Sequence, residues 1–386
     1  MTRKETGDFM KLLFASDSFK GSLTSQRISQ LLTLAAKEVF GECECIGVPV
    51  ADGGEGTVHA VTEAACGEIQ TASAHDPLMN PIKAEYGVFE GKAIIEMSAA
   101  SGLTLVPEEL RDPMNTSTFG TGELILDALD RGCREIAVAI GGSATNDGGT
   151  GCMTALGARF LDENGAELSG CGRDLLKVKK IDLSGLDKRI KDTRFSVLCD
   201  VKSPLCGKNG ATYLYSEQKG AAPKTKEELE RGMINYRDLI KTSFGVDCDK
   251  IEGAGAAGGL GAALKVFLNA QMRSGIDAVL DMIHFNELLE GVDLVITGEG
   301  KTDAQSCRGK VVQGVGRRAK ARGIPVVCLS GSLGKGAEEL YSDGISAFMT
   351  TVNSPMTLGE AMKNAESLYF CAAKEMFRLI KTGRSI

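Results

Sequence analysis

Five segments of the sequence combine glycines with hydroxyl-bearing and acidic side chains: 17–22 (DSFKGS), 52–57 (DGGEGT), 141–151 (GGSATNDGGTG), 199–204 (CDVKSP) and 298–303 (GEGKTD). Glycines let the backbone approach a ligand closely, and successive backbone amides form nests that bind anions. Carboxylates bind Mg²⁺ or accept a proton. These parts suit phosphoryl transfer, which needs amide cradles and lysines for phosphates, acids for Mg²⁺ and a group that orients the attacking hydroxyl.

The first two segments are candidates for holding a small anionic substrate. Segment 17–22 lies between a predicted strand and the start of a helix, where free amides and the helix dipole favour an anion. Its candidate binding residues are Asp17, Ser18 and Lys20, and those of the second segment are Gly53, Gly54 and Glu55. Lys20 is also a candidate catalytic residue, and so is Asp52. The alternative for both segments is an ordinary turn with a side chain that caps the next helix.

The third segment follows the predicted strand Ile136–Ile140 directly and holds five glycines in eleven residues. It is a candidate nest of donors for a polyphosphate, with Asp147 as a possible metal ligand. The residues that would contact the nucleotide are Gly141, Gly142, Ser143, Thr145, Asn146 and Gly148. The alternative is a long tight turn without a ligand.

The last two segments place acids just past predicted strands. Asp200 is a candidate catalytic residue or a helix N-cap, and Glu299 and Asp303, four residues apart, are candidate metal ligands. Segment 298–303 is not a Walker A loop, because the first glycine of that motif would fall at Val295.

A further stretch, Gly253–Gly261, matches the G-x-G-x-x-G pattern of dinucleotide-binding proteins at Gly253, Gly255 and Gly258. The segment before it is polar and does not read as the buried strand that this motif requires. Close packing on small residues explains the stretch equally well. A small-molecule kinase is therefore the leading class, followed by a dinucleotide-dependent dehydrogenase and then a non-enzymatic binding module.

Composition narrows the classes further. The chain has 386 residues with a net charge of −7, which argues against a nucleic-acid partner. No serine lies in a G-x-S-x-G motif and the three histidines lack metal spacing, so nucleophilic hydrolysis and zinc chemistry are disfavoured. Twelve scattered cysteines indicate free thiols and a cytoplasmic protein, and no apolar run is long enough to cross a membrane. Glycine is in excess, with 48 residues where about 7% is usual.

Strands and helices alternate at both ends of the chain, which predicts a parallel-sheet α/β fold. Predicted strands over Lys11–Ala15 and Ile46–Ala51 and a helix from Thr24 open the chain, and one long helix over Leu358–Ile380 closes it. We expect residues 10–67 and 286–386 to form one discontinuous Rossmann- or flavodoxin-like domain. Residues 68–285 then form an inserted α/β domain with a mixed sheet, and Met1–Phe9 a disordered leader.

The five segments, in this order, resemble those of the type I glycerate kinase family. The resemblance rests on the blocks 14–21, 49–57, 141–151, 199–201 and 296–303 and runs nearly end to end. It implies two α/β domains with the ligand cleft between them, one flavodoxin-like and the other restriction-endonuclease-like. It also implies a Mg²⁺-dependent phosphorylation of D-glycerate by ATP, mainly to 2-phosphoglycerate, with a glycerate 3-kinase or a kinase of another small hydroxy acid as the alternatives.

Under this hypothesis Lys20 and nearby amides hold the glycerate carboxylate, and Asp52 or Asp200 orients or deprotonates the attacking hydroxyl. The loop 141–151 cradles the ATP phosphates, and Mg²⁺ is held by acids drawn from Asp147, Glu299 and Asp303. The expected partners are small molecules only, with neither nucleic acid nor membrane, and the oligomeric state stays open.

Overall fold

The computed structural model describes residues 9–384, and within these residues the chain packs as two compact units. Unit 1 takes the chain up to Asp52, residues 63–65, and everything from Gly275 onward. Unit 2 takes Gly53–Thr62 and Cys66–Ser274. The domain boundaries expected at residues 67 and 286 concern which parts of the chain fold independently, and they stay a prediction. The expected leader lies outside the described residues, apart from Phe9.

Unit 1 contains a parallel five-stranded sheet built from both ends of the chain. The strand order is β15-β13-β11-β1-β2, and all four pairings are parallel. Numbered within the unit, this is the 2-1-3-4-5 order of flavodoxin-like folds, so the predicted parallel-sheet α/β unit is confirmed. The strands are β1 (Met10–Phe14), β2 (Cys43–Gly47), β11 (Leu294–Thr297), β13 (Val326–Ser330) and β15 (Ala347–Thr350), with a small separate pair, β12 (Lys301–Thr302) and β14 (Ser332–Leu333).

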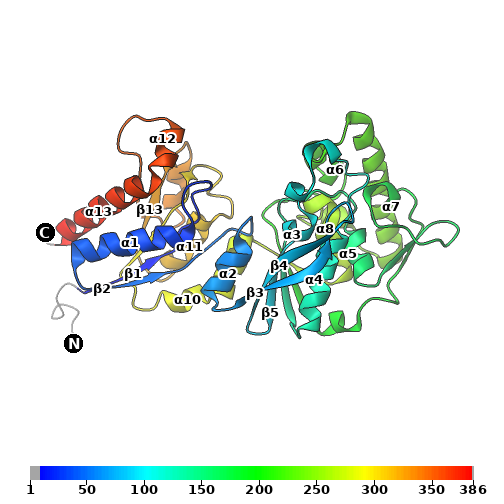
Figure 1. The fold of residues 1–386 in the computed structure, drawn as a ribbon, viewed down its shortest axis with the longest axis horizontal. Helices are drawn as coiled ribbons and strands as arrows, with labels where there is room; N and C mark the ends of the chain where they lie inside the picture. The colour runs from blue at the N-terminus through cyan, green and yellow to red at the C-terminus, as the bar shows by residue number, and fades with distance from the viewer. Residues whose placement is uncertain (1–8, 385–386) are drawn as a thin grey trace. The chain divides into compact units, whose positions relative to one another are not determined.

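Helices cover this sheet, and α1 and α13 lie side by side along it (Figure 1). Phe14 of β1 meets Phe377 of α13 with ring centroids 6.3 Å apart, in a core shared with Leu12, Ile28 and Leu32. Helix α1 begins where the sequence indicates, because the Thr24 side chain accepts a hydrogen bond from the first turn. The helices of the unit are α1 (Ser25–Phe40), α9 (Gly275–Met282), α10 (Phe285–Leu288), α11 (Val311–Lys320), α12 (Leu358–Lys363) and α13 (Ala365–Arg384).

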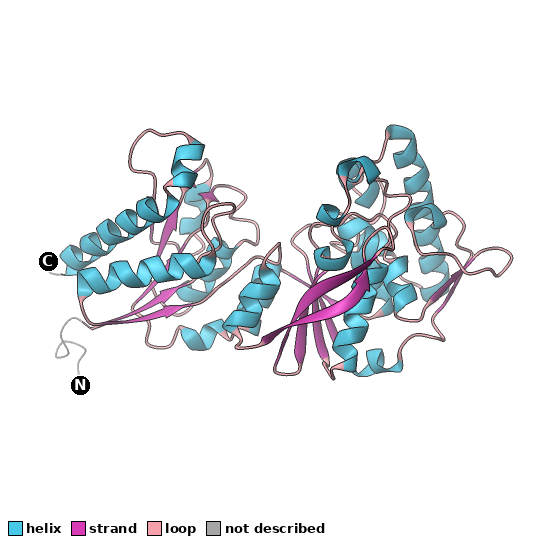
Figure 2. Cartoon of the chain, viewed as in Figure 1, coloured by secondary structure: helices cyan, strands magenta, loops and turns pink. Residues whose placement is uncertain are grey.

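Unit 2 contains a mixed six-stranded sheet in the order β10-β9-β6-β5-β4-β3, as predicted for the second α/β unit. The β3–β4 and β4–β5 pairings are antiparallel and the remaining pairings are parallel. Helices flank these strands (Figure 2). The strands are β3 (Glu68–His75), β4 (Pro81–Phe89), β5 (Lys92–Glu96), β6 (Glu135–Ala139), β9 (Arg194–Leu198) and β10 (Gln271–Arg273), with a small pair, β7 (Arg159–Leu161) and β8 (Lys180–Asp182).

The helices of unit 2 surround a single large apolar core. They are α3 (Ser98–Ser101), α4 (Phe119–Asp130), α5 (Thr150–Ala155), α6 (Ala211–Tyr215), α7 (Pro223–Phe244) and α8 (Leu260–Phe267). Helix α2 (Thr57–Ala64) is divided between the units, with residues up to Thr62 in unit 2 and its last two residues in unit 1.

Two predicted elements were wrong in their limits. The second strand occupies Cys43–Gly47 instead of Ile46–Ala51, because its pairing with β1 fixes the register at Met10 opposite Cys43. The closing helix is two helices, because α12 ends at Lys363, the backbone of Asn364 leaves helical geometry, and α13 starts anew at Ala365.

None of the helices in the described part of the chain combines the length and hydropathy that crossing a bilayer requires. All twelve cysteines are free thiols, as expected.

Candidate active site

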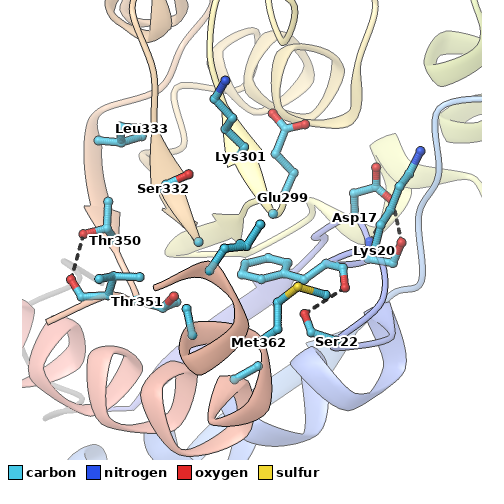
Figure 3. A pocket seen from close by; sticks show the side chains of 18 of the residues that line it. Asp17, Lys20, Ser22, Glu299, Lys301, Ser332, Leu333, Thr350, Thr351 and Met362 are labelled. Atoms are coloured by element: carbon cyan, nitrogen blue, oxygen red, sulfur yellow. Dashed lines mark hydrogen bonds between the residues drawn. The ribbon is translucent and has the colours of Figure 1, made fainter. Parts of the chain in front are cut away.

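A cavity of about 810 Å³ opens in unit 1 where its strands end (Figure 3). The segments that follow β1, β11, β13 and β15 at their carboxyl ends all line it, together with α12. The polar or charged lining residues are Asp17, Ser18, Lys20, Ser22, Asp52, Glu299, Lys301, Lys310, Ser332, Thr350, Thr351 and Thr357. Its apolar lining includes Phe19, Leu333, Val352, Met356, Leu358, Ala361, Met362 and Ala365.

The sheet topology explains why a cavity forms at this place. The chain runs from β1 to β2 on one side of the sheet, whereas β11, β13 and β15 follow on the other side. The loops after β1 and β11 therefore diverge in opposite directions, and ligands bind at such switch points in open α/β sheets.

Segment 17–22 forms a compact loop at the end of β1. The Asp17 amide donates to the carbonyl of Gly298 at 2.9 Å, which joins this loop to the segment after β11. The Ser22 hydroxyl donates to the carbonyl of Phe19 at 2.9 Å, and Gly21 adopts a φ of +77°. Lys20 is exposed at the cavity, with its side chain beside Asp17 (Figure 3).

The pKa of Asp17 in the cavity is shifted by its surroundings. The pKa of its carboxyl is raised to about 6, mainly by burial and also by the nearby charges of Asp52 and Glu299. The Ser18 amide opposes this by donating a hydrogen bond to Asp17 Oδ1 at 2.7 Å. A carboxylate with a pKa near neutrality can accept a proton and give it up again.

Glu299 lies at the end of β11 and is only 6% exposed. Its carboxylate accepts hydrogen bonds from the hydroxyls of Ser306 and Thr302, yet burial still raises its pKa. Asp303 differs, because its ion pair with Lys301 at 2.9 Å lowers its pKa. Glu299 therefore faces the cavity, whereas the carboxylate of Asp303 is already neutralised by a lysine.

The glycine-rich loop 141–151 belongs to unit 2, where most of it is buried. Only Gly141 and Gly142 of the loop are exposed. A Cβ at Gly148 would overlap the ring of Tyr236, and one at Gly149 would overlap Ala263. Close packing thus accounts for these glycines, and nucleotide binding by Gly141, Gly142, Ser143, Thr145, Asn146 and Gly148 stays a prediction.

Asp147 is fully buried at the centre of this loop. Its carboxylate accepts hydrogen bonds from the Thr118 amide and hydroxyl at 2.8 and 2.7 Å, and from the Gly149 and Gly151 amides at 3.1 and 3.2 Å. Burial nevertheless raises its pKa. These hydrogen bonds give Asp147 a structural role in the loop. Its role as a metal ligand stays a prediction.

A buried lysine that the sequence did not single out supports the same loop. Lys219 Nζ donates to Ser143 Oγ and to the Thr145 carbonyl, both at 2.7 Å, and burial lowers its pKa to about 7. It lies just after α6, between Glu217 and Gly220, and the sequence alone does not show that its side chain is buried.

The stretch 253–261 packs against this loop. Gly258 has a φ of +64°, and a Cβ there would overlap the carbonyl oxygen of Thr145. The Gly148 amide donates to the Gly258 carbonyl at 2.9 Å. Of the two interpretations of this stretch, the contacts therefore support close packing.

The remaining predicted residues are not among those that line the cavity. Asp200 is exposed in unit 2, just past β9. Gly53, Gly54 and Glu55 also belong to unit 2, where the Thr57 hydroxyl donates to the Gly54 carbonyl and closes the turn. The division between the units falls directly after Asp52, which does line the cavity.

Within the described residues, no group of three or more histidine, cysteine, aspartate or glutamate side chains is arranged to hold a metal ion. The cavity does gather Asp17, Asp52 and Glu299, whose charges act on one another. Mg²⁺ commonly takes only one or two protein carboxylates, with water and substrate phosphates as its other ligands. These carboxylates fit such a site.

Comparison with known proteins agrees with the two-unit architecture. A "Glycerate kinase" from Halalkalibacterium halodurans is 42% identical over 95% of this chain and 97% of its own. A "Glycerate 2-kinase" from Escherichia coli K12 is 45% identical over 92% of this chain and 94% of its own. A solved structure from Salmonella typhimurium LT2, described as a glycerate kinase 2, superimposes with a TM-score of 0.89 at 41% identity and covers 98% of this chain and 100% of that one. Residues 12–381 match the sequence model of the "Glycerate kinase family", and the chain belongs to that family.

Proposed function

We propose that this protein transfers the γ-phosphoryl group of ATP to D-glycerate and forms mainly 2-phosphoglycerate. The observation that carries this proposal is the 45% identity to the glycerate 2-kinase of Escherichia coli, which extends over nearly the whole of both chains. The cavity of unit 1 supports it, because it supplies carboxylates and lysines in one place. The free thiols suit a reducing compartment, and we propose that the enzyme works in the cytoplasm.

In this mechanism the hydroxyl oxygen of glycerate forms a bond to the γ-phosphorus, while the bond from that phosphorus to the bridging oxygen of ADP breaks. Asp17 takes the hydroxyl proton, since its pKa of about 6 leaves it ionised but basic at neutral pH. Lys20 binds the glycerate carboxylate at the edge of the cavity. Asp52 lines the same cavity as Asp17 and orients the hydroxyl of glycerate.

Glu299 and Asp52 are the residues that would hold Mg²⁺, which neutralises charge on the polyphosphate when bound. Asp200 stays a candidate from the sequence, with an exposed side chain in unit 2. The G-x-G-x-x-G match that suggested a dehydrogenase is explained by packing, because Gly258 lies against Thr145.

The decisive experiment incubates the protein with ATP, D-glycerate and Mg²⁺ and resolves the product by phosphorus NMR. We expect 2-phosphoglycerate. A 3-phosphate product would overturn the regiochemistry alone, and the absence of any phosphoglycerate would overturn the kinase proposal. L-Glycerate serves as the matched control substrate.

A further inference from the structure

The cavity of unit 1 has two chemically different ends. One end carries Asp17, Lys20 and Glu299 with their neighbouring charges, and the other carries large apolar side chains. Asp17 and Leu333 lie on opposite sides of the cavity in Figure 3, with Met362 between them. We refer to the apolar lining residues Leu333, Val352, Met356, Leu358 and Met362 as the apolar end.

The apolar end is open to solvent to an unusual degree for such side chains. Leu358 is 76% exposed, Leu333 is 41% exposed and Met362 is 39% exposed. No residue of α12 is buried, and this helix is held by a capping box between Thr357 and Glu360. Large apolar side chains that gather unburied at one end of a cavity mark a ligand surface.

Glycerate does not explain this surface. It is a three-carbon acid in which every carbon carries oxygen, so its complement is the charged end. The cavity volume of about 810 Å³ falls in the range of about 300–1,000 Å³ that is typical of sites for larger organic ligands. The site therefore has room for a second, larger molecule with an apolar part.

A nucleotide matches both ends at once. Its base offers flat apolar faces to leucine and to the adaptable side chain of methionine. Its phosphates need cations, and Lys301 and Lys310 line the cavity in addition to Lys20, which is assigned to glycerate. Met362 reaches across toward the loop after β1, since a Cβ at Gly21 would lie 3.1 Å from Met362 Cε. The two ends are thus parts of one continuous site.

The position in the fold favours the same ligand class. The cavity lies at the carboxyl ends of β1 and β11, the switch point of the sheet, where open α/β sheets bind nucleotides. We propose that the apolar end formed by Leu333, Val352, Met356, Leu358 and Met362 binds the base and ribose of ATP, with the phosphates directed toward the lysines. This inference rests on the proposed function in taking ATP as the phosphoryl donor.

Photo-crosslinking locates the base directly. The whole protein is irradiated with 8-azido-ATP, with and without excess ADP, and labelled peptides are identified by mass spectrometry. We expect ADP-sensitive labelling within residues 350–365. ADP-sensitive labelling within 141–151 or 253–261 instead would overturn the inference.

A matched pair of variants tests the energetics. Leu358→Asp places a charge in the apolar end, and Leu379→Asp makes the same change at a 66% exposed position on α13 outside the cavity. We expect the Kd for ADP, measured by calorimetry, to rise about tenfold or more in Leu358→Asp and to stay within about twofold in the control. In the kinase assay the KM for ATP rises while the KM for glycerate does not.

Wild-type ADP affinity in Leu358→Asp would overturn the inference. If that variant melts early by circular dichroism, Leu358→Ala replaces it, with the same expected direction. If the protein forms phosphoglycerate but is labelled elsewhere, only the proposed nucleotide subsite is overturned. A protein that binds ADP through Leu358 but forms no phosphoglycerate loses only the proposed kinase function.

Discussion

Asp17 shows how a site can be built at the expense of stability. An aspartate whose pKa is raised to about 6 in the folded chain is harder to ionise there than in the unfolded chain, where 3.8 is usual. At neutral pH the ionised carboxylate therefore disfavours the folded state. The same feature provides a base whose pKa lies near the working pH.

We expect Asp17→Asn to stabilise the protein at pH 7. The folded pKa lies above the unfolded pKa, so the unfavourable contribution is absent below about pH 4 and is complete above about pH 6. The shift corresponds to roughly 1–3 kcal/mol, and neutral asparagine removes it. Urea unfolding at pH 7 and pH 4 checks this: the variant gains stability only at pH 7, and a loss at pH 7 would contradict the prediction.

The same residue should govern the pH dependence of turnover. Because the base must be deprotonated, we expect kcat/KM to fall as pH drops through about 6. Asp17→Asn should lower kcat by roughly 100-fold or more and remove this acid limb. Asp182→Asn, which removes a carboxylate from β8 in unit 2, is the control and should keep the profile. An unchanged acid limb in Asp17→Asn would assign the base to another residue.

Asp147 is expected to matter for folding more than for the metal. Asp147→Ala would leave the Thr118, Gly149 and Gly151 donors unpaired in a buried loop, at a cost of roughly 3 kcal/mol. Thermal melting should show the loss, while the Mg²⁺ concentration needed for half-maximal activity stays the same. A shifted Mg²⁺ requirement with an unchanged melting temperature would support the metal assignment instead.

At the scale of elements, glycine-rich segments that look alike in sequence have two different structural roles. Gly258 and Gly259 serve the contact with the loop 141–151, where their backbone lies directly against the backbone of Thr145, Asn146 and Gly148. The loop after β1 uses Gly21 for a turn beside a cavity. Composition alone does not separate a ligand nest from a tightly packed loop pair.

We expect Gly258→Ala to destabilise unit 2 by roughly 2–4 kcal/mol. The new methyl group would overlap the Thr145 carbonyl, and a φ of +64° disfavours alanine on its own. Gly165→Ala is the matched control, because Gly165 has a φ of +78° but open space around its Cβ position. Denaturant midpoints compare the two, and equal losses would mean that backbone strain alone explains the effect.

Local signals predicted the elements well where they were self-contained. Helix α1 begins at the expected residue Thr24, since capping is a local interaction, and Gly41 follows its last residue. The limits of β2 were missed, because its register is set by β1 and not by its own residues. In the site, Asp17, Asp52 and Glu299 were predicted from their sequence neighbours, and all three line the cavity. Leu333, Met356, Leu358 and Met362 were not, because only the strand order brings them to the same cavity.

At the scale of the whole molecule, the chain leaves unit 1, completes unit 2 and returns. Unit 2 contains every strand of its sheet within residues 68–273. Helix α2 contributes contacts to it as well: the Val58 amide donates to Glu96 Oε1 at 2.8 Å. We propose that unit 2 folds on its own.

This proposal predicts a difference between two fragments. Residues 53–274 retain the Val58–Glu96 hydrogen bond, whereas residues 68–285 lose it and end in α9 and part of α10, which belong to unit 1. We expect both fragments to unfold cooperatively by circular dichroism, with 53–274 melting at the higher temperature. The reverse order would favour the boundaries predicted from the sequence.

The sheet of unit 1 has a consequence for synthesis. Its strand β1 lies between β2 and β11 and pairs with β11, so that Leu12 lies opposite Leu294. During translation at roughly 5–20 residues per second, the apolar strand β1 leaves the ribosome tens of seconds before its partner exists. Throughout that time unit 2 can fold, while the edge of β1 that later pairs with β11 has no partner strand. The first fifty residues therefore form the stretch of the nascent chain most in need of chaperone protection.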